Sequence, residues 1–222
     1  MKQDNTSGMG RAGFVIAKEG YPFIFAPAFT TVVLVVLGLT LPALLFAALT
    51  LFVCFFFRDP DRTAPPDPDA IVSPADGRVI IAGERVKDPF DDKETLKISI
   101  FMSIFNVHVN RIPFDGRVED ILYHPGKFFS ANLDKASVEN EHNAVKITAE
   151  KNRSLWVVQI AGLVARRIIC RIEKEEMVHK GVRFGLICFG SRLDLYLPAD
   201  TEIKISKGQK ARAGETILGY MP

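Results

Sequence analysis

The sequence has 222 residues, of which 48% are hydrophobic and 24% charged, with 16 glycines, 13 prolines and three cysteines. These counts exclude a collagen-like repeat, a disordered chain and a disulfide scaffold, and a formal net charge of +2 gives no electrostatic footprint for nucleic acid. From Gly20 to Phe57 there is no Asp, Glu, Lys or Arg, which indicates a membrane-attached protein with a globular part of about 165 residues.

The N-terminal part divides into a tail, residues 1–20, and a hydrophobic helical membrane segment, residues 21–57. Ile24 to Phe57 would form a single helix of about 50 Å, which exceeds a hydrocarbon core of about 30 Å. Pro22 and Pro27 disfavour an early helix start. The segment therefore has two arrangements, a hairpin or a single kinked span.

A break in the middle of this segment favours the hairpin. Gly38 to Pro42 can interrupt a helix, whereas the single span would run from about Thr30 to Phe57. Both ends carry basic residues, which are Lys2, Arg11, Lys18, Arg58 and Arg62. The positive-inside rule then places both ends in the cytoplasm. We expect the protein at the cell (inner) membrane, with its catalytic domain on the cytoplasmic side.

A Pro-rich linker, residues 58–69, precedes a domain of short β-type runs, residues 70–222. The sequence predicts a mainly β (α+β) fold, sandwich- or barrel-like, with a short helix at Ala131–Glu141. The predicted strands are Arg78–Ala82, Leu96–Met102, Val107–Arg111, Gly116–Tyr123, Ala144–Ala149, Leu155–Ala161, Ile168–Arg171, Phe184–Phe189, Leu193–Leu197, Glu202–Ile205 and Thr216–Leu218. The cysteines, Cys54, Cys170 and Cys188, lack metal-ligand spacing and are expected to be reduced.

Three short stretches combine residues that carry chemistry, although each also has an ordinary structural interpretation. Ser73–Val79 (SPADGRV) is typical of a β-turn into a strand. Asn106–Pro113 (NVHVNRIP) places His108, Asn110 and Ile112 on one strand face, and a single histidine there is commonly structural. Phe189–Arg192 (FGSR) is typical of a bulge or tight bend.

A strained Gly-Ser bond has a particular reactivity. The hydroxyl of Ser191 can attack the carbonyl of Gly190 and convert the amide to an ester. A base that removes the Ser191 α-proton then eliminates the ester and leaves dehydroalanine, which hydrolyses to a pyruvoyl group. His108 is a candidate for this base, with Asp76 orienting it, by the logic of Ser–His–Asp sites.

The chain resembles the phosphatidylserine decarboxylase proenzymes, in their short bacterial and archaeal form. The resemblance runs from about residue 55 to the C-terminus. Five ordered stretches carry it, namely FFRDP (56–60), SPADGRV (73–79), IFMSIFNVHVNRIP (100–113), LDKASVENEHN (133–143) and RFGLICFGSRLDLYLP (183–198).

The resemblance implies a carboxy-lyase that cuts itself between Gly190 and Ser191. The products are a β chain, residues 1–190, and an α chain, residues 191–222, which begins with a pyruvoyl group made from Ser191. That group forms a Schiff base with membrane phosphatidylserine, releases carbon dioxide and yields phosphatidylethanolamine. Neither pyridoxal phosphate nor a metal ion is needed. A homo-oligomer is compatible with the sequence.

The resemblance also assigns roles to single residues. Asp76 matches an aspartate implicated in self-cleavage, and His108 matches a histidine proposed to act in decarboxylation. Longer relatives have a second histidine three positions later, where this chain has Arg111, which is not a base at neutral pH. Either His108 serves both steps or Asp76 acts more directly. By charge and position, Arg192 and Arg111 are candidates for binding the lipid phosphate.

Two other classes of protein stay open from the residues. The segment around Lys135 looks like the lysine hairpin of lipoyl-type carrier modules. A membrane-anchored serine hydrolase would use Ser191, His108 and Asp76 without cutting the chain. Within the resembling family, another lipid with a serine head group is an alternative substrate.

Overall fold

The computed structural model describes residues 16–127, 139–150, 153–162, 167–188 and 191–222. The chain divides into two compact units between Asp61 and Arg62. This boundary falls inside the stretch predicted as a linker, residues 58–69.

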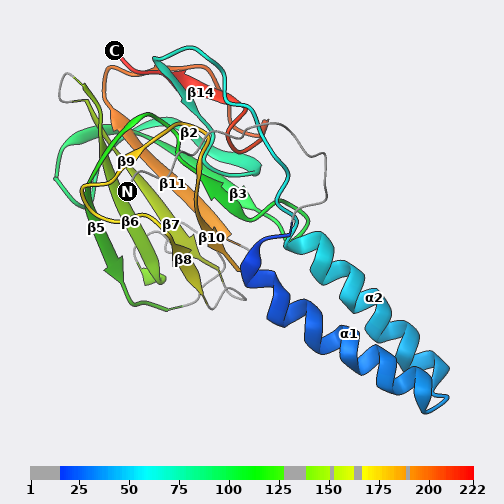
Figure 1. The fold of residues 1–222 in the computed structure, drawn as a ribbon. Coiled ribbons are helices and arrows are strands. Elements are labelled where there is room, and N and C mark those ends of the chain that lie inside the picture. The colour runs from blue at the N-terminus through cyan, green and yellow to red at the C-terminus, as the bar shows by residue number, and fades with distance from the viewer. Residues whose placement is uncertain (1–15, 128–138, 151–152, 163–166, 189–190) are drawn as a thin grey trace, which may run out of the picture. The chain divides into compact units, whose positions relative to one another are not determined.

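The first unit is a pair of apolar helices. A 3-10 turn, η1 (Lys18–Gly20), leads into α1 (Tyr21–Val36), and α2 (Thr40–Phe56) packs against it (Figure 1). Pro22 lies in the first turn of α1, where its missing N–H would have no partner in the helix. The expectation that proline delays the helix start is therefore wrong, and Pro27 is accommodated inside α1.

The two helices reverse direction over residues 37–39. Gly38 has a φ of +72°, in the left-handed region that a side chain would strain. At the opposite end, the backbone N–H of Ala17 donates to the carbonyl oxygen of Phe57 at 2.8 Å. Both chain ends of the hairpin therefore meet at one end of it.

The second unit is built from strands. In chain order these are β1 (Ala70–Val72), β2 (Gly77–Lys87), β3 (Glu94–Met102), β4 (Val109–Arg111), β5 (Gly116–His124), β6 (His142–Thr148), β7 (Ser154–Ala161), β8 (Ile168–Cys170), β9 (Met177–Val178), β10 (Arg183–Ile187), β11 (Ser191–Pro198), β12 (Glu202–Ile203), β13 (Lys210–Ala211) and β14 (Ile217–Tyr220).

Antiparallel pairing joins these strands into three sheets. The largest has the order β13-β2-β3-β11-β7-β6-β5-β9, and two three-stranded sheets have the orders β1-β14-β12 and β4-β10-β8. The large sheet curls, as Figure 1 shows. The predicted mainly β, sandwich- or barrel-like fold is therefore confirmed.

The hydrophobic core lies on one face of the large sheet. Alternate residues of β11, namely Leu193, Leu195 and Leu197, are fully buried in it beside Ile98 and Ile100 of β3. This alternation is the period of two that a strand imposes. The same alternation turns Ser191 toward the core face.

Every predicted strand overlaps an observed one, and three short strands were missed. These are β1, β9 and β13, each only two or three residues long, which is too short for alternation to be recognised. Residues 131–138 of the predicted helix Ala131–Glu141 lie outside the described residues.

The glycine of the SPADGRV stretch is required by a close approach of two strands. A Cβ atom on Gly77 would lie 2.2 Å from the carbonyl oxygen of Phe101. No side chain fits at that distance, so a glycine is needed for β2 to begin against β3. Gly77 thereby fixes the place of the neighbouring Asp76.

A charged cluster stabilises the part of the sheet far from Ser191. The Nζ atom of Lys146 lies 3.0 Å from Asp91 and 3.2 Å from Glu119, and the indole N–H of Trp156 donates to Asp91 at 3.2 Å. Burial opposes ionisation of Asp91, but the hydrogen bonds from Lys146 and Trp156 outweigh it and lower the Asp91 pKa. A hydrogen bond from Thr148 lowers the pKa of Glu119.

We expect this cluster to make stability depend on pH at the acid end. A carboxyl group with a lowered folded-state pKa contributes stability above its unfolded pKa and loses it as the pH falls. The free energy of unfolding should therefore decrease as the pH falls from about 5 toward 2. Lys146→Met should reduce this dependence by about 1 kcal/mol. Denaturant unfolding followed by fluorescence of Trp156, the single tryptophan, measures both. Parallel pH curves for the two proteins would contradict the assignment.

Candidate active site

Ser191 is the first residue of β11, between two neighbouring strands. It pairs with Met102 of β3 on one side and Ala161 of β7 on the other, and its side chain is fully buried. Its hydroxyl donates to the thioether sulfur of Met102 at 3.3 Å. Because a thioether is a weak acceptor and no base, this contact orients the hydroxyl and leaves its proton in place. Gly190 lies outside the described residues.

Buried amide side chains continue from Met102 into the molecule. The amide of Asn110 donates to the Met102 sulfur at 3.8 Å, Gln159 donates to Asn110 at 2.9 Å, and Asn143 donates to Gln159 at 3.1 Å. All of these side chains are buried. They form a continuous polar relay (Met102, Asn110, Gln159 and Asn143) that ends at Ser191.

Sequence reasoning missed most of this relay. Asn110 was placed on one strand face with His108, and that alternation was the signal available. Gln159 and Asn143 lie in strands made mostly of apolar residues. They come face to face only because β6 pairs with β7 in the register that sets Asn143 opposite Gln159.

His108 is fully buried just before β4. Its Nδ1 atom lies 2.9 Å from the carbonyl oxygen of Asn106. Because a carbonyl oxygen only accepts hydrogen bonds, this contact assigns the ring proton to Nδ1 and the basic lone pair to Nε2. The N–H of Ile187 donates to the His108 carbonyl at 3.4 Å. His108 is thereby held beside the end of β10, three residues before position 190.

Asp76 is buried and has two partners of its own. One carboxylate oxygen accepts from the N–H of Ala213 at 2.7 Å, and the other accepts from Arg62 at 3.2 Å. Arg62 also contacts Glu215 at 3.0 Å. These contacts tie the Asp76 turn to the C-terminal segment. The Asn106 carbonyl faces Nδ1 of His108, and the orienting role expected of Asp76 stays a prediction.

Both candidate phosphate ligands are buried against protein groups. Arg111 donates to the carbonyl oxygen of Gly181 at 2.8 Å. Arg192 is fully buried, donating to Asp194 at 2.6 Å and to Ser99 at 2.9 Å. The predicted phosphate contacts stay predictions, and they would require these partners to separate.

Among the described residues, no His, Cys, Asp and Glu side chains are grouped so as to hold a metal ion. A competing nucleophile in this part of the molecule is Cys170. Burial raises the pKa of its thiol, which keeps it protonated and a poor nucleophile near neutral pH. Lys135, the candidate carrier lysine, lies outside the described residues.

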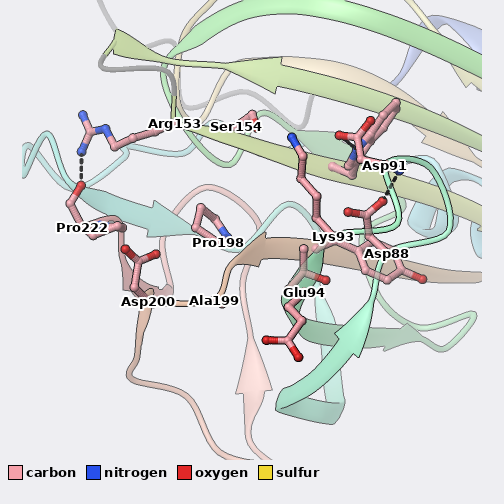
Figure 2. Close-up of a pocket in the computed structure, with 13 residues that line it drawn as sticks. Asp88, Asp91, Lys93, Glu94, Arg153, Ser154, Pro198, Ala199, Asp200 and Pro222 are labelled. Carbon is pink, nitrogen blue, oxygen red and sulfur yellow. Dashed lines mark hydrogen bonds between the residues drawn. The ribbon is translucent and has the colours of Figure 1, made fainter.

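A cavity with charged walls lies elsewhere. It measures about 350 Å³ and is lined from the opposite end of β11, at Pro198, with Asp88, Lys93 and Asp200 among its walls. Figure 2 shows Arg153 directed at the last residue, Pro222, across this cavity. Ser191, His108 and Asp76 are not among its lining residues.

The sequence was compared with known families and proteins. A family described as phosphatidylserine decarboxylase matches residues 49–219. A protein of Geotalea uraniireducens named phosphatidylserine decarboxylase proenzyme is 51% identical over 207 residues, covering 93% of this chain and 97% of the relative. Proteins of the same name from Geobacter metallireducens and Desulfotalea psychrophila are 50% and 48% identical, covering 93% of this chain and 97% and 96% of their own lengths.

The geometry at His108 predicts a specific tautomer. At neutral pH the ring should carry its proton on Nδ1, because the Asn106 carbonyl accepts from that atom. Long-range ¹H–¹⁵N spectra of the labelled protein measure this, with His108→Gln used to assign the signals. A proton found on Nε2 would contradict the contact and would place the basic lone pair on Nδ1 instead.

Proposed function

The chain belongs to the phosphatidylserine decarboxylase family, and we propose that it cuts itself at Gly190–Ser191 and then converts phosphatidylserine to phosphatidylethanolamine. The observation that carries the proposal is the buried hydroxyl of Ser191, held at the start of β11 with a histidine beside the strand that leads to it. A buried serine that directly follows a glycine suits attack on its own backbone better than attack on a substrate from solvent. This favours the decarboxylase over the hydrolase.

The self-cleavage follows from the chain's own atoms. The Ser191 Oγ atom bonds to the Gly190 carbonyl carbon, the C–N bond breaks, and the serine nitrogen takes a proton to become a free amine. Removal of the Ser191 α-proton then breaks the Cβ–O bond, which releases Gly190 as a carboxylate. The dehydroalanine tautomerises to an imine, and water converts this to a ketone with loss of ammonia.

His108 is the group best suited to remove the α-proton. Its Nδ1–H is directed to Asn106, so the neutral ring carries its basic lone pair on Nε2. Arg111 stands where longer relatives have a second histidine, and its side chain contacts the Gly181 carbonyl. We therefore assign the base role to His108. Asp76 then has a positioning role, because its contacts with Ala213 and Arg62 hold its own turn against the C-terminal segment.

The surroundings of position 191 fit a pyruvoyl group. That group has one heavy atom fewer than the serine residue from which it is made, so a site filled by serine can hold it. A pyruvoyl group supplies a carbonyl that condenses with a primary amine and accepts the electron pair left by carbon dioxide. The Oγ atom of Ser191 leaves with Gly190, so its hydrogen bond to Met102 is lost on cutting, and the strand pairing of residue 191 with Met102 would hold this end of β11.

We further propose that the hairpin of α1 and α2 anchors the enzyme in the cytoplasmic leaflet of the cell membrane. Its outward side chains are apolar, with Phe25 exposed to 70% and Val36 to 80%. The hydroxyls of Thr30, Thr31 and Thr50 donate to carbonyl oxygens one turn earlier, so these three hydroxyls do not require water. Among the described helices, the continuous stretch of η1 and α1, Lys18–Val36, is the one that is long and apolar enough to cross a membrane.

The length of the hairpin suggests how deeply it inserts. At 16 and 17 residues, the helices are about 24 and 26 Å long, shorter than a hydrocarbon core of about 30 Å. The turn at residues 37–39 is apolar and would stay within hydrocarbon. The hairpin would then enter and leave on the same side, and phosphatidylserine would need to present only its head group.

Intact-mass measurement of the purified protein, beside Ser191→Ala, tests the cut. We expect two fragments that divide at Gly190/Ser191, with the smaller one carrying a pyruvoyl end, and one uncut chain for the variant. Only the cut protein should release carbon dioxide from phosphatidylserine vesicles.

A folded wild-type protein that stays in one unmodified piece would overturn the proposal. Reaction of that intact protein with a fluorophosphonate probe at Ser191 would instead support the hydrolase.

A charge at the hairpin turn tests the anchor in the full-length protein. Leu37 and Leu39 are 65% and 48% exposed, so Leu37→Asp/Leu39→Asp should leave the helices folded. Binding to vesicles should weaken by about tenfold or more, because a charge is costly in hydrocarbon. Co-sedimentation with vesicles measures the binding. Tyr21→Asp, at the opposite end of α1, is the matched control and should have a much smaller effect. Equal losses for both variants would contradict the proposed depth.

A further inference from the structure

Charged side chains are buried directly after Ser191. The guanidinium of Arg192 donates through Nε to Asp194 at 2.6 Å and through Nη2 to Ser99 at 2.9 Å. The second oxygen of Asp194 lies 3.1 Å from Nζ of Lys97. Arg192 and Asp194 are both fully buried. By strand alternation they lie on the face of β11 opposite Ser191.

Buried charges are seldom the most stabilising choice for a strand. Removing charges from water costs more than their attraction often returns, and apolar residues of the same volume usually serve at least as well. What a buried ion pair adds is a fixed geometry, since each charge must stay with its partner. The buried charges therefore indicate that residues 192–194 must be held in one register, for a reason other than stability alone.

The self-cleavage supplies such a reason. After the cut, Ser191 becomes the first residue of the α chain, and β11 loses its covalent link on that side. New chain ends fray readily, because few contacts hold them. Arg192 and Asp194 would then belong to the α chain, while Lys97 and Ser99 of β3 would belong to the β chain. The polar contacts bridge the two products within four residues of the new end.

We propose that Lys97, Ser99, Arg192 and Asp194 form a clamp that keeps the amino end of the α chain in register on β3 after the cut. The inference rests on the proposed self-cleavage. The clamp residues are positioning residues, since they act by holding residue 191 and not by touching the substrate. In the uncut chain the clamp is less important, because the peptide link to residue 190 also holds the strand.

Comparing cut and uncut protein tests the clamp. Asp194→Asn is made in the self-cleaving chain and in the uncut Ser191→Ala chain, and hydrogen exchange is measured at the backbone amides of residues 192–196. We expect the substitution to speed exchange by at least about tenfold in the cut protein and by no more than about threefold in the uncut one. In the cut protein kcat should fall in parallel.

Two further comparisons separate the clamp from a general loss of stability. Arg192→Lys keeps a charge that can reach Asp194, so it should retain more protection than Arg192→Met. Lys204→Gln removes a charge from an exposed pair with Glu202, also within the α chain. It should change exchange at residues 192–196 in neither background.

The outcomes distinguish this inference from the function on which it rests. A wild-type chain that is never cut would overturn the proposed function. Normal cutting, with equal effects of Asp194→Asn in the cut and uncut proteins, would overturn the clamp alone. Folded variants at Asp194 and Arg192 that all stay uncut would assign the cluster to the cutting step, and would likewise overturn the clamp.

Discussion

The pairing of β11 with β3 and β7 is the constraint on which the candidate site depends. Because β11 lies inside the large sheet, its register fixes which residues meet Ser191, and it sets Met102 and Ala161 opposite that residue. A slip by one residue would turn Ser191 to the other face and bring Arg192 into the core. The same register therefore determines both the nucleophile and the buried charges beside it.

The two faces of β11 bury different kinds of polar group. On the core face, the polar relay consists of uncharged side chains, namely three amides that donate in turn and the thioether of Met102. On the other face, full charges are paired within one cluster.

Local patterns predicted the strands and the residues with distinctive chemistry. Alternation located Leu193–Leu197, and a Gly-Ser pair between apolar strands pointed to Ser191. Partners that meet through pairing between distant strands had no local signal. Met102 reads as an ordinary core residue, and the contact of Arg192 with Ser99 joins positions far apart in the sequence. Charge and position made Arg192 a candidate for a lipid phosphate, a role that stays a prediction, and its contacts with Asp194 and Ser99 had no local signal.

Burial of Ser191 also bears on which way an ester at this position would react. An ester exposed to water can hydrolyse, which would cut the chain and return an ordinary serine end. Excluding water removes that side reaction and leaves elimination as the route open to a nearby base. Ser191 and His108 are both fully buried, so both groups assigned to the proposed elimination are shielded from solvent. Water is needed only later, to convert the dehydroalanine, when the peptide link between residues 190 and 191 has already been broken. The proposed sequence of steps thus requires a closed site first and an accessible one afterwards, and a strand that is cut at its own buried end provides both.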